Sequence, residues 1–243
     1  TEYICDLGLQ SALVGVTKFC VHPSHVKESA QIIGGTKNPN IEKILALKPD
    51  LILANKEENR EADILALEDR CNVYVSNINT LSDSLEMVSS LGDILAQTNK
   101  AKEIRGRLES IFTQIKNNAE THSSRKALYL IWQKPFMAAG TDTYISKMLE
   151  LFGMENVVSG LENTSTRYPE LSKEDIDAIN PDLILLSSEP YPFKTEHCTT
   201  FSKTFNKKTI LVDGELFSWY GTRLIKCFPS ITDIGTDIRA IFL

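Results

Sequence analysis

The sequence predicts an α/β protein with two lobes that contain parallel sheets and are joined by one long, rigid backbone helix, with a ligand cleft between the lobes. Two observations predict this fold class. The run Pro-Asp-Leu-Ile-Leu occurs twice, at Pro49–Leu53 and Pro181–Leu185, each time after a stretch with helical spacing. Between the two copies, residues 82–120 have a long helical pattern with no strand signal.

Each copy of the repeat reads as a helix that leads into a strand. Ile and Leu residues recur at helical spacing before the proline, which ends the helix because it lacks a backbone N–H. The Leu-Ile-Leu run that follows suits a strand buried in a parallel sheet. Two such units, far apart in the sequence, favour two similar lobes over a solenoid. A cleft between the lobes is the expected consequence.

The elements alternate on both sides of the long helical stretch, which is the pattern of a parallel sheet. The first half predicts helix 1–7, strand 13–16, helix 41–47, strand 51–54, helix 60–69 and strand 73–75. In the middle, Gly92 and Gln97-Thr98-Asn99 separate two helices, and the second, about 100–120, is the link. The second half predicts strand 127–132, helices 143–152 and 172–179, strands 183–187 and 209–212, and a helix near 221–227.

These elements divide the chain into an N-terminal α/β lobe of residues 1–98, a backbone helix of residues 99–121 and a C-terminal α/β lobe of residues 122–243. A helical link bends less than a Gly/Ser linker, so we expect the lobes to move by small angles. The alternative is an amphipathic helix packed on one larger sheet.

Composition narrows the class of protein. The hydrophobic fraction of 42% and charged fraction of 24% are typical of a globular domain, and no uninterrupted apolar stretch reaches the length of about 18 residues that spans a bilayer. The net charge of −6 gives no general electrostatic reason to expect nucleic acid as a partner. Five cysteines without a C-x-x-C pair do not indicate a disulfide scaffold.

The candidate site lies on the loops after the predicted strands, because ligands of open α/β sheets bind outside the carboxyl ends of the strands. These loops hold both tryptophans and several Tyr and Lys residues, which are typical of a pocket for a bulky organic ligand. The ligand-binding residues that we expect are Lys18, Phe19, His22, Trp132, Arg167, Tyr168, Tyr191, Lys194, Trp219, Tyr220 and Arg223.

The charges on these loops predict the sign of the ligand. Lys18, Lys134, Arg167, Lys194 and Arg223 would make a locally positive pocket, which favours an anionic chelate or the carboxylate edge of a tetrapyrrole. The G-x-S-x-G, H-E-x-x-H, Walker and G-x-G-x-x-G motifs do not occur in the sequence, so we assign no catalytic residue and no cofactor. His22 is interpreted as a pocket-wall residue, with direct ligation of a metal as the alternative, and no metal ligand is assigned.

Five segments carry a resemblance to a known family. They are G-V-x-K-F-C-x-H-P from residue 15, G-G-T-K-x-x-N-I-E-K-I-x-A-L-K-P-D-L-I-L-A-N-K-E-E-N from 34, R-Y-P-E-L-S from 167, L-L-S-S-E-P-Y-P-F-K from 185 and F-S-W-Y-G-T-R from 217. With the long helix, they resemble the metal-chelate substrate-binding proteins of ABC importers, closest to the cobalamin-binding type. The resemblance implies that a corrinoid, haem or ferric siderophore is bound between the lobes without chemistry, and it does not choose among the three.

The resemblance also implies a partner and a compartment. In that family an exposed glutamate on each lobe docks onto arginines of the membrane permease. Glu61 is at the first-lobe position, and Glu189 or Glu215 is at the second. A monomer in the periplasm or another extracytoplasmic space is implied by the family, whereas the residues, which include no visible signal peptide, leave a cytoplasmic location open.

Two other functions compete with this hypothesis. A cleft enzyme of nitrogenase-like architecture would need several cysteines at the lobe interface, and only Cys20 falls on a predicted cleft loop. A receptor for a bare metal ion would need three or four His, Asp or Glu ligands, and the predicted cleft holds one histidine.

Overall fold

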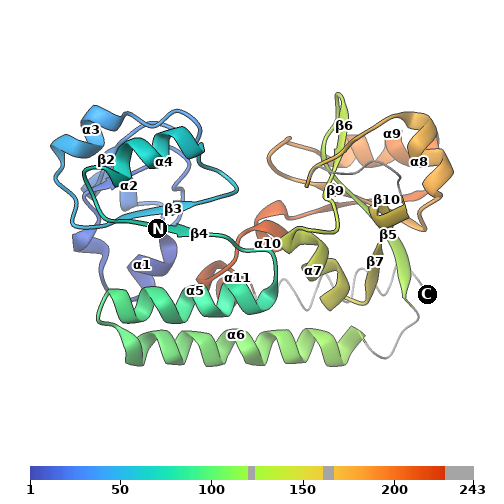
Figure 1. The fold of residues 1–243 in the computed structure, drawn as a ribbon. Helices are drawn as coiled ribbons and strands as arrows, with labels where there is room; N and C mark the ends of the chain where they lie inside the picture. Colours follow the sequence, from blue (N-terminus) through green and yellow to red (C-terminus); the bar gives the residue numbers. More distant parts are fainter. Residues whose placement is uncertain (120–123, 161–166, 228–243) are drawn as a thin grey trace. The chain divides into compact units, whose positions relative to one another are not determined.

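The computed structural model describes residues 1–119, 124–160 and 167–227, which form two compact units (Figure 1). The first unit contains Thr1–Ile78 and Glu86–Ile104. The second contains Asn79–Leu85 and the chain from Arg105 onward. Helices α5 (Leu81–Ile94) and α6 (Thr98–Ala119) therefore each hold residues of both units. The two helices match the prediction for this stretch, and residues 120 and 121 lie outside the described part of the chain.

The first unit contains two small parallel sheets. Strand β1 (Gly15–Val16) pairs with β2 (Gln31–Ile32), and β3 (Ile52–Asn55) pairs with β4 (Val73–Ser76). The helices of this part are α1 (Glu2–Asp6), η1 (Gln10–Ala12), α2 (Val26–Ser29), α3 (Ile41–Ala46) and α4 (Glu61–Glu68). The sequence does not predict α2 and β2, because elements of two to four residues are too short to show a period.

The repeated sequence does form the same structure twice, with α3 leading into β3 and α8 (Lys173–Ile179) leading into β9 (Leu183–Ser187). Asn40 caps α3 by accepting a hydrogen bond from the Lys43 N–H at 2.8 Å. The residue before each repeat proline is left-handed, with φ 50° at Lys48 and φ 51° at Asn180. This single left-handed residue ends the helix and turns the chain into the strand.

The second unit is built on a six-stranded sheet with the order β10-β9-β5-β6-β8, and β7 also pairs with β5. The remaining strands are β5 (Arg125–Trp132), β6 (Phe136–Ala138), β7 (Met154–Asn156), β8 (Glu170–Leu171) and β10 (Lys208–Val212). Strands β5, β9 and β10 run parallel, as predicted. Strand β7, which was not predicted, also runs parallel to β5, whereas β6 and β8 add antiparallel pairs. The turn between β5 and β6 is too short for the crossover that a parallel pair needs.

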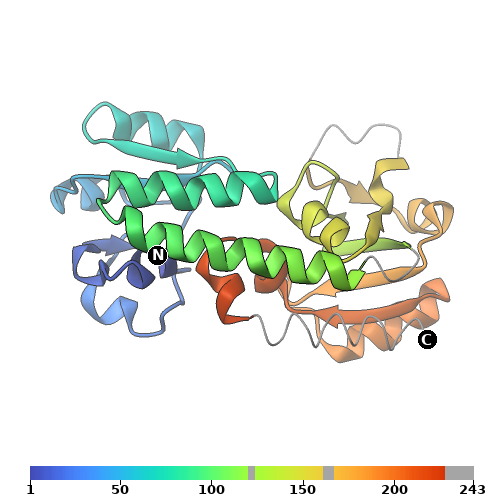
Figure 2. The same ribbon diagram turned by 90° about the horizontal axis from the view of Figure 1, so that it is seen from below.

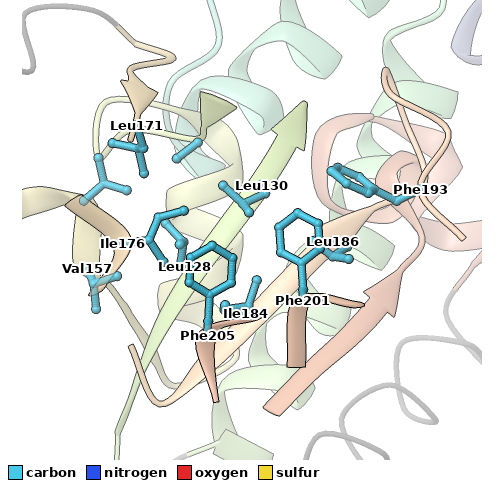
Figure 3. Close-up of a cluster of buried hydrophobic side chains, with 12 residues drawn as sticks. Leu128, Leu130, Val157, Leu171, Ile176, Ile184, Leu186, Phe193, Phe201 and Phe205 are labelled. Carbon is cyan, nitrogen blue, oxygen red and sulfur yellow. The ribbon is translucent and has the colours of Figure 1, made fainter. Parts of the chain in front are cut away.

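The second unit also contains helices and a 3-10 turn, several of which cover the faces of this sheet. They are α7 (Tyr144–Leu151), η2 (Val157–Gly160), α8, α9 (Thr195–Phe205), α10 (Gly214–Ser218) and α11 (Thr222–Lys226). On one face, side chains of β5 and β9 pack against Ile176 of α8 and Phe201 and Phe205 of α9 (Figure 3). On the other face, Tyr129 of β5 contacts Phe217 of α10 with ring centroids 5.3 Å apart. Both faces are therefore buried, which explains the continuous apolar run of β9.

Helices α5 and α6 run side by side in both views (Figures 1 and 2). In the first unit, a Cβ placed on Gly92 would collide with Ala101, so the two helices approach closely at this glycine. In the second unit, Arg105 Nη1 donates a hydrogen bond to the Leu85 carbonyl at 3.3 Å. Across the described residues, no helix has both the length and the apolar character needed to cross a membrane.

Candidate functional site

Three loops of the second unit share one edge of its sheet, because each follows one of the parallel neighbours β5, β9 and β10. Trp132 is the last residue of β5 and leads into its loop, Tyr191 lies on the loop after β9, and Trp219 and Tyr220 lie on the segment after β10. The carboxyl ends of parallel strands are where α/β sheets bind ligands. We call these three loops the aromatic edge.

Trp132 and Tyr191 form the first aromatic pair of this edge, with ring centroids 5.4 Å apart and an edge-on geometry. The Tyr191 hydroxyl donates to Gln133 Oε1 at 2.6 Å, and the Trp132 indole N–H donates to the Lys134 carbonyl at 3.2 Å. Both rings are thus held by hydrogen bonds as well as by packing. Trp132 keeps 37% of its surface exposed, so part of the residue remains available to a ligand.

The segment after β10 is fastened to the end of β9. Asp213 caps α10 by accepting from the Glu215 N–H at 3.0 Å, and the Gly214 N–H donates to Ser188 Oγ at 2.9 Å. Ser218 Oγ lies 3.1 Å from Glu189 Oε1. Burial raises the pKa of the half-buried Glu189 carboxyl, and hydrogen bonds from the Ser218 and Trp219 side chains oppose that rise.

Tyr220 and Arg223 complete the aromatic edge. The Tyr220 ring packs edge-on against Tyr144 of α7 with centroids 5.6 Å apart. Arg223 Nε lies 3.7 Å from Glu215 Oε2, and both side chains are largely buried. A positive charge that is already paired in this way offers less net charge to an anionic ligand than sequence reasoning assumes.

Arg167 and Tyr168 lie elsewhere in the second unit. They do not follow a parallel strand but precede β8, the last strand along the path of the sheet. The Arg167 carbonyl accepts from the Gly140 N–H at 2.8 Å, and Arg167 Nε donates to the Asp142 carbonyl at 2.9 Å. Arg167 and Tyr168 therefore belong to one segment, which is hydrogen-bonded to the loop after β6.

Lys194 begins α9 rather than a free loop. Its N–H donates to His197 Nδ1 at 2.8 Å, and the His197 ring also contacts Tyr191 and Phe193 edge-on. The imidazole therefore ties the start of α9 to the aromatic edge. Glu196, next in α9, is exposed.

In the first unit, Lys18 and Phe19 sit on the loop after β1. Lys18 Nζ lies 5.0 Å from the centroid of the Phe19 ring, and that ring is 53% exposed. Lys27 Nζ donates to the Lys18 carbonyl at 2.6 Å and so fixes the loop. His22 is half-buried on the same loop. Cys20 is also half-buried, with its Sγ 3.0 Å from Thr1 Oγ1.

Hydrogen bonds join the loops after β2 and β3 of the first unit. The Asn59 side chain donates to the Thr36 carbonyl at 3.0 Å, and Thr36 Oγ1 donates to Glu58 Oε2 at 3.2 Å. Lys37 Nζ donates to the Glu57 carbonyl at 2.7 Å. These contacts hold the polar ends of β2 and β3 together just before Glu61, which is exposed at the first position of α4.

Three residues of the second unit were not predicted from the sequence as site residues. Gln133 anchors the Tyr191 hydroxyl, and Tyr144 backs the Tyr220 ring, but each reads in the sequence as an ordinary loop or helix-face residue. Glu196 has a signal in the repeat: α9 follows β9 as α4 follows β3, so Glu196 in the first turn of α9 corresponds to Glu61. Glu189, chosen from the repeat instead, is half-buried and hydrogen-bonded.

In the part of the chain that the structure describes, no three His, Cys, Asp or Glu side chains come close enough together to hold a metal ion. The aromatic edge instead offers rings, amide and hydroxyl groups and cations. Such groups bind the faces and edges of a bulky ligand.

The model of the periplasmic binding protein family matches residues 1–211 of this chain. Among curated relatives, an uncharacterized ABC transporter substrate-binding lipoprotein of Bacillus subtilis is 26% identical over 237 residues, covering 93% of this chain and 74% of that protein. A vitamin B12-binding protein of Vibrio vulnificus is 27% identical over 192 residues, covering 77% and 67%. A high-affinity heme uptake system protein of Staphylococcus aureus is 24% identical over 196 residues, covering 80% and 65%.

Solved structures support the fold class. The periplasmic vitamin B12-binding protein of Vibrio cholerae has a TM-score of 0.82 at 19% identity, covering 98% of this chain and 94% of that one. The heme complex of the Staphylococcus aureus heme uptake protein has a TM-score of 0.78 at 22% identity, covering 97% and 94%. The predicted class of a two-lobed α/β protein with a helical backbone is therefore confirmed.

Proposed function

Because this chain belongs to the periplasmic binding protein family, whose members bind ligands rather than transform them, we propose that it captures a metal chelate and delivers it to the permease of an ABC importer. The chelate is a corrinoid, a haem or a ferric siderophore. The aromatic edge of the second unit is the single observation that carries the proposal, because it presents a partly exposed tryptophan beside fixed polar groups.

The aromatic rings and the charged groups are assigned to different parts of the ligand. We assign Trp132, Tyr191, Trp219 and Tyr220 to the faces of the ligand and Lys194 and Arg223 to its anionic edge. Arg167 and Tyr168 add a second polar and aromatic group in the same unit, and Lys18, Phe19 and His22 do so in the first unit. The relatives that bind vitamin B12 or heme support this ligand class.

The proposal places the protein outside the cytoplasm as a monomer, with the permease as its protein partner. We assign Glu61 to docking in the first unit. In the second unit, Glu196 joins Glu189 and Glu215 as a candidate. Glu196 is exposed, whereas Glu189 is hydrogen-bonded to Ser218 and Glu215 lies 3.7 Å from Arg223.

Absorbance titration distinguishes the three chelates. Haem and cobalamin have strong visible bands that shift when an aromatic pocket surrounds them. A ferric siderophore has a weaker charge-transfer band, so its binding is followed by quenching of the two tryptophans. We expect one of the three to saturate at one equivalent. If none of the chelates alters either signal, the proposed function is wrong.

A second experiment tests the sign of the ligand. An anionic chelate bound by Arg167 and Arg223 should lose affinity as salt is raised, because salt screens exposed charges. The Arg167→Ala, Arg223→Ala double variant should lose both affinity and much of this salt dependence. Binding that is insensitive to salt and survives the double substitution would remove the anionic ligand from the proposal.

A further inference from the structure

The Glu189 carboxyl group contacts the segment that carries Trp219 and Tyr220. Ser218 Oγ is 3.1 Å from Glu189 Oε1, and the Trp219 side chain hydrogen-bonds the same carboxyl. The indole N–H is the only polar donor that a tryptophan side chain has. Two consecutive residues of the segment after β10 are therefore fastened to one carboxyl group at the end of β9.

We propose that Glu189 is a positioning residue for ligand binding, and that the loss or gain of one proton on its carboxyl group changes how Trp219 is held. The link to ligand binding rests on the proposed function, since it takes Trp219 as a binding residue. The contact between Glu189 and Trp219 does not depend on the proposed function. The two can therefore be tested separately.

Close packing against Gly214 fixes the Glu189 side chain. A Cβ on Gly214 would stand 2.5 Å from Glu189 Cγ and 2.5 Å from Ser187 Oγ, so only a glycine leaves room for both. Ser187 Oγ accepts from the buried Tyr129 hydroxyl at 3.1 Å and donates to the Glu189 carbonyl at 2.5 Å. The carboxyl group consequently has a rigid base, and its hydrogen bonds to the next segment have a defined direction.

The Ser218 hydroxyl makes this arrangement sensitive to a proton. Its oxygen lies 3.1 Å from Glu189 Oε1 and 2.7 Å from the Gly214 carbonyl, but it has one hydrogen to donate. When Glu189 is ionised, its two oxygens can accept from both Ser218 and Trp219, and the negative charge strengthens both hydrogen bonds. When Glu189 is protonated, its O–H can donate to Ser218 Oγ, which then donates to Gly214. Protonation therefore removes the negative charge that strengthens the hydrogen bond from the Trp219 indole.

The charges around Glu189 favour its protonated form. Burial is the main cause that raises its pKa above the ordinary 4.5, and the carboxylates of Glu215 and Asp213 raise it further. Of the other groups packed here, Arg223 lies 3.7 Å from Glu215, and the buried Tyr129 hydroxyl has its own pKa raised by burial, so it stays neutral. The proton of Glu189 is thus exchanged at a higher pH than that of an exposed glutamate.

Tryptophan fluorescence of the ligand-free protein tests the proposal. Trp132 and Trp219 are the only tryptophans, so in a Trp132→Phe background the emission reports Trp219 alone. We expect one pH transition above 4.5. Glu189→Gln, which cannot ionise, should abolish it. An unchanged transition in Glu189→Gln, or no transition in the background protein, would overturn the proposal.

Two further variants give shifts with opposite signs and serve as controls if Glu189→Gln does not fold. Glu215→Gln removes a neighbouring negative charge, so the transition should move to lower pH. Ser218→Ala removes a hydrogen bond that favours the ionised carboxyl, so the transition should move to higher pH. If the pH of the transition does not change in either variant, the proposal is contradicted.

The connection to binding is measured with the chelate that the titration identifies. Its dissociation constant in the protein with both tryptophans should change across the same pH range, and Glu189→Gln should flatten this dependence. If the fluorescence transition behaves as expected and no chelate binds, the positioning role stands and the proposed function fails. If a chelate binds with a pH profile that Glu189→Gln leaves unchanged, the positioning role in binding is wrong.

Discussion

At the scale of single residues, the two tryptophans of the aromatic edge are held by different means. Trp132 is fixed by its ring contact with Tyr191 and by a hydrogen bond to a backbone carbonyl. Trp219 is fixed by a side chain, Glu189, whose charge depends on pH. The sequence could predict both rings from their position after strands. It could not predict that Glu189 holds Trp219, because this contact exists only where β9 and β10 lie side by side.

Trp132→Ala and Trp219→Ala should each weaken chelate binding about fivefold or more. An aromatic contact contributes about 1 kcal/mol beyond the area that it buries, and a fivefold change in affinity corresponds to that energy. Isothermal titration calorimetry measures the loss. Should both tryptophan variants bind like the unmodified protein, the aromatic edge is not the binding surface.

At the scale of elements, long apolar patterns were predicted well and short ones were not. The strands at 51–54, 127–132, 183–187 and 209–212 were found with their ends within one or two residues. Strands β2 and β8 have two residues each and carry no readable alternation. Helix α9 was not predicted, because its polar residues outnumber the phenylalanines that pack on the sheet.

The repeat offers a test of how each helix ends. Lys48 has φ 50°, which costs a side chain with a Cβ about 1–2 kcal/mol relative to an ordinary helical residue, so Lys48→Gly should raise the free energy of unfolding by up to about 1 kcal/mol. Ala46→Gly, two residues earlier and inside α3, should lower it by about 0.5–1 kcal/mol. Urea unfolding monitored by circular dichroism gives both values. Equal signs for the two variants would contradict this description of the helix end.

At the scale of the whole molecule, the chain forms two units and passes between them in α5 and α6. The two-lobed class was predictable because a repeat on each side of a long helical stretch leaves few other arrangements. The boundaries at residues 98 and 121 stay a prediction. The aromatic edge was predictable from strand order, whereas the separate anchoring of Arg167 was not, since β6 and β8 are antiparallel strands without a strong pattern.

Glu61→Lys should abolish stimulation of the cognate importer while chelate affinity stays unchanged. Glu61 is exposed at the start of α4, so its replacement disturbs no buried contact. A surface ion pair contributes only about 0–1 kcal/mol, so the charge acts chiefly on encounter and orientation, which a charge reversal opposes. Transport into permease-containing vesicles measures the effect. Transport at the unmodified rate would remove Glu61 from docking.

The second-unit glutamates are compared in the same assay. Glu196→Lys should impair transport in the same way, because Glu196 corresponds to Glu61 in the repeat and is exposed. Glu174→Lys, on the exposed start of α8, serves as the matched control. If Glu196→Lys leaves transport unchanged while Glu215→Lys blocks transport with ligand affinity intact, the docking residue is Glu215, which the sequence first indicated.

Native mass spectrometry of the protein mixed with the three chelates and with free ferric and cobalt ions tests the central claim most directly. The account predicts one added mass, that of an intact chelate, at a ratio of one to one and without change to the chelate after long incubation. A complex with a bare metal ion would favour a metal-ion receptor, and an altered chelate would favour an enzyme. Either result, or the absence of any bound chelate, would contradict the account.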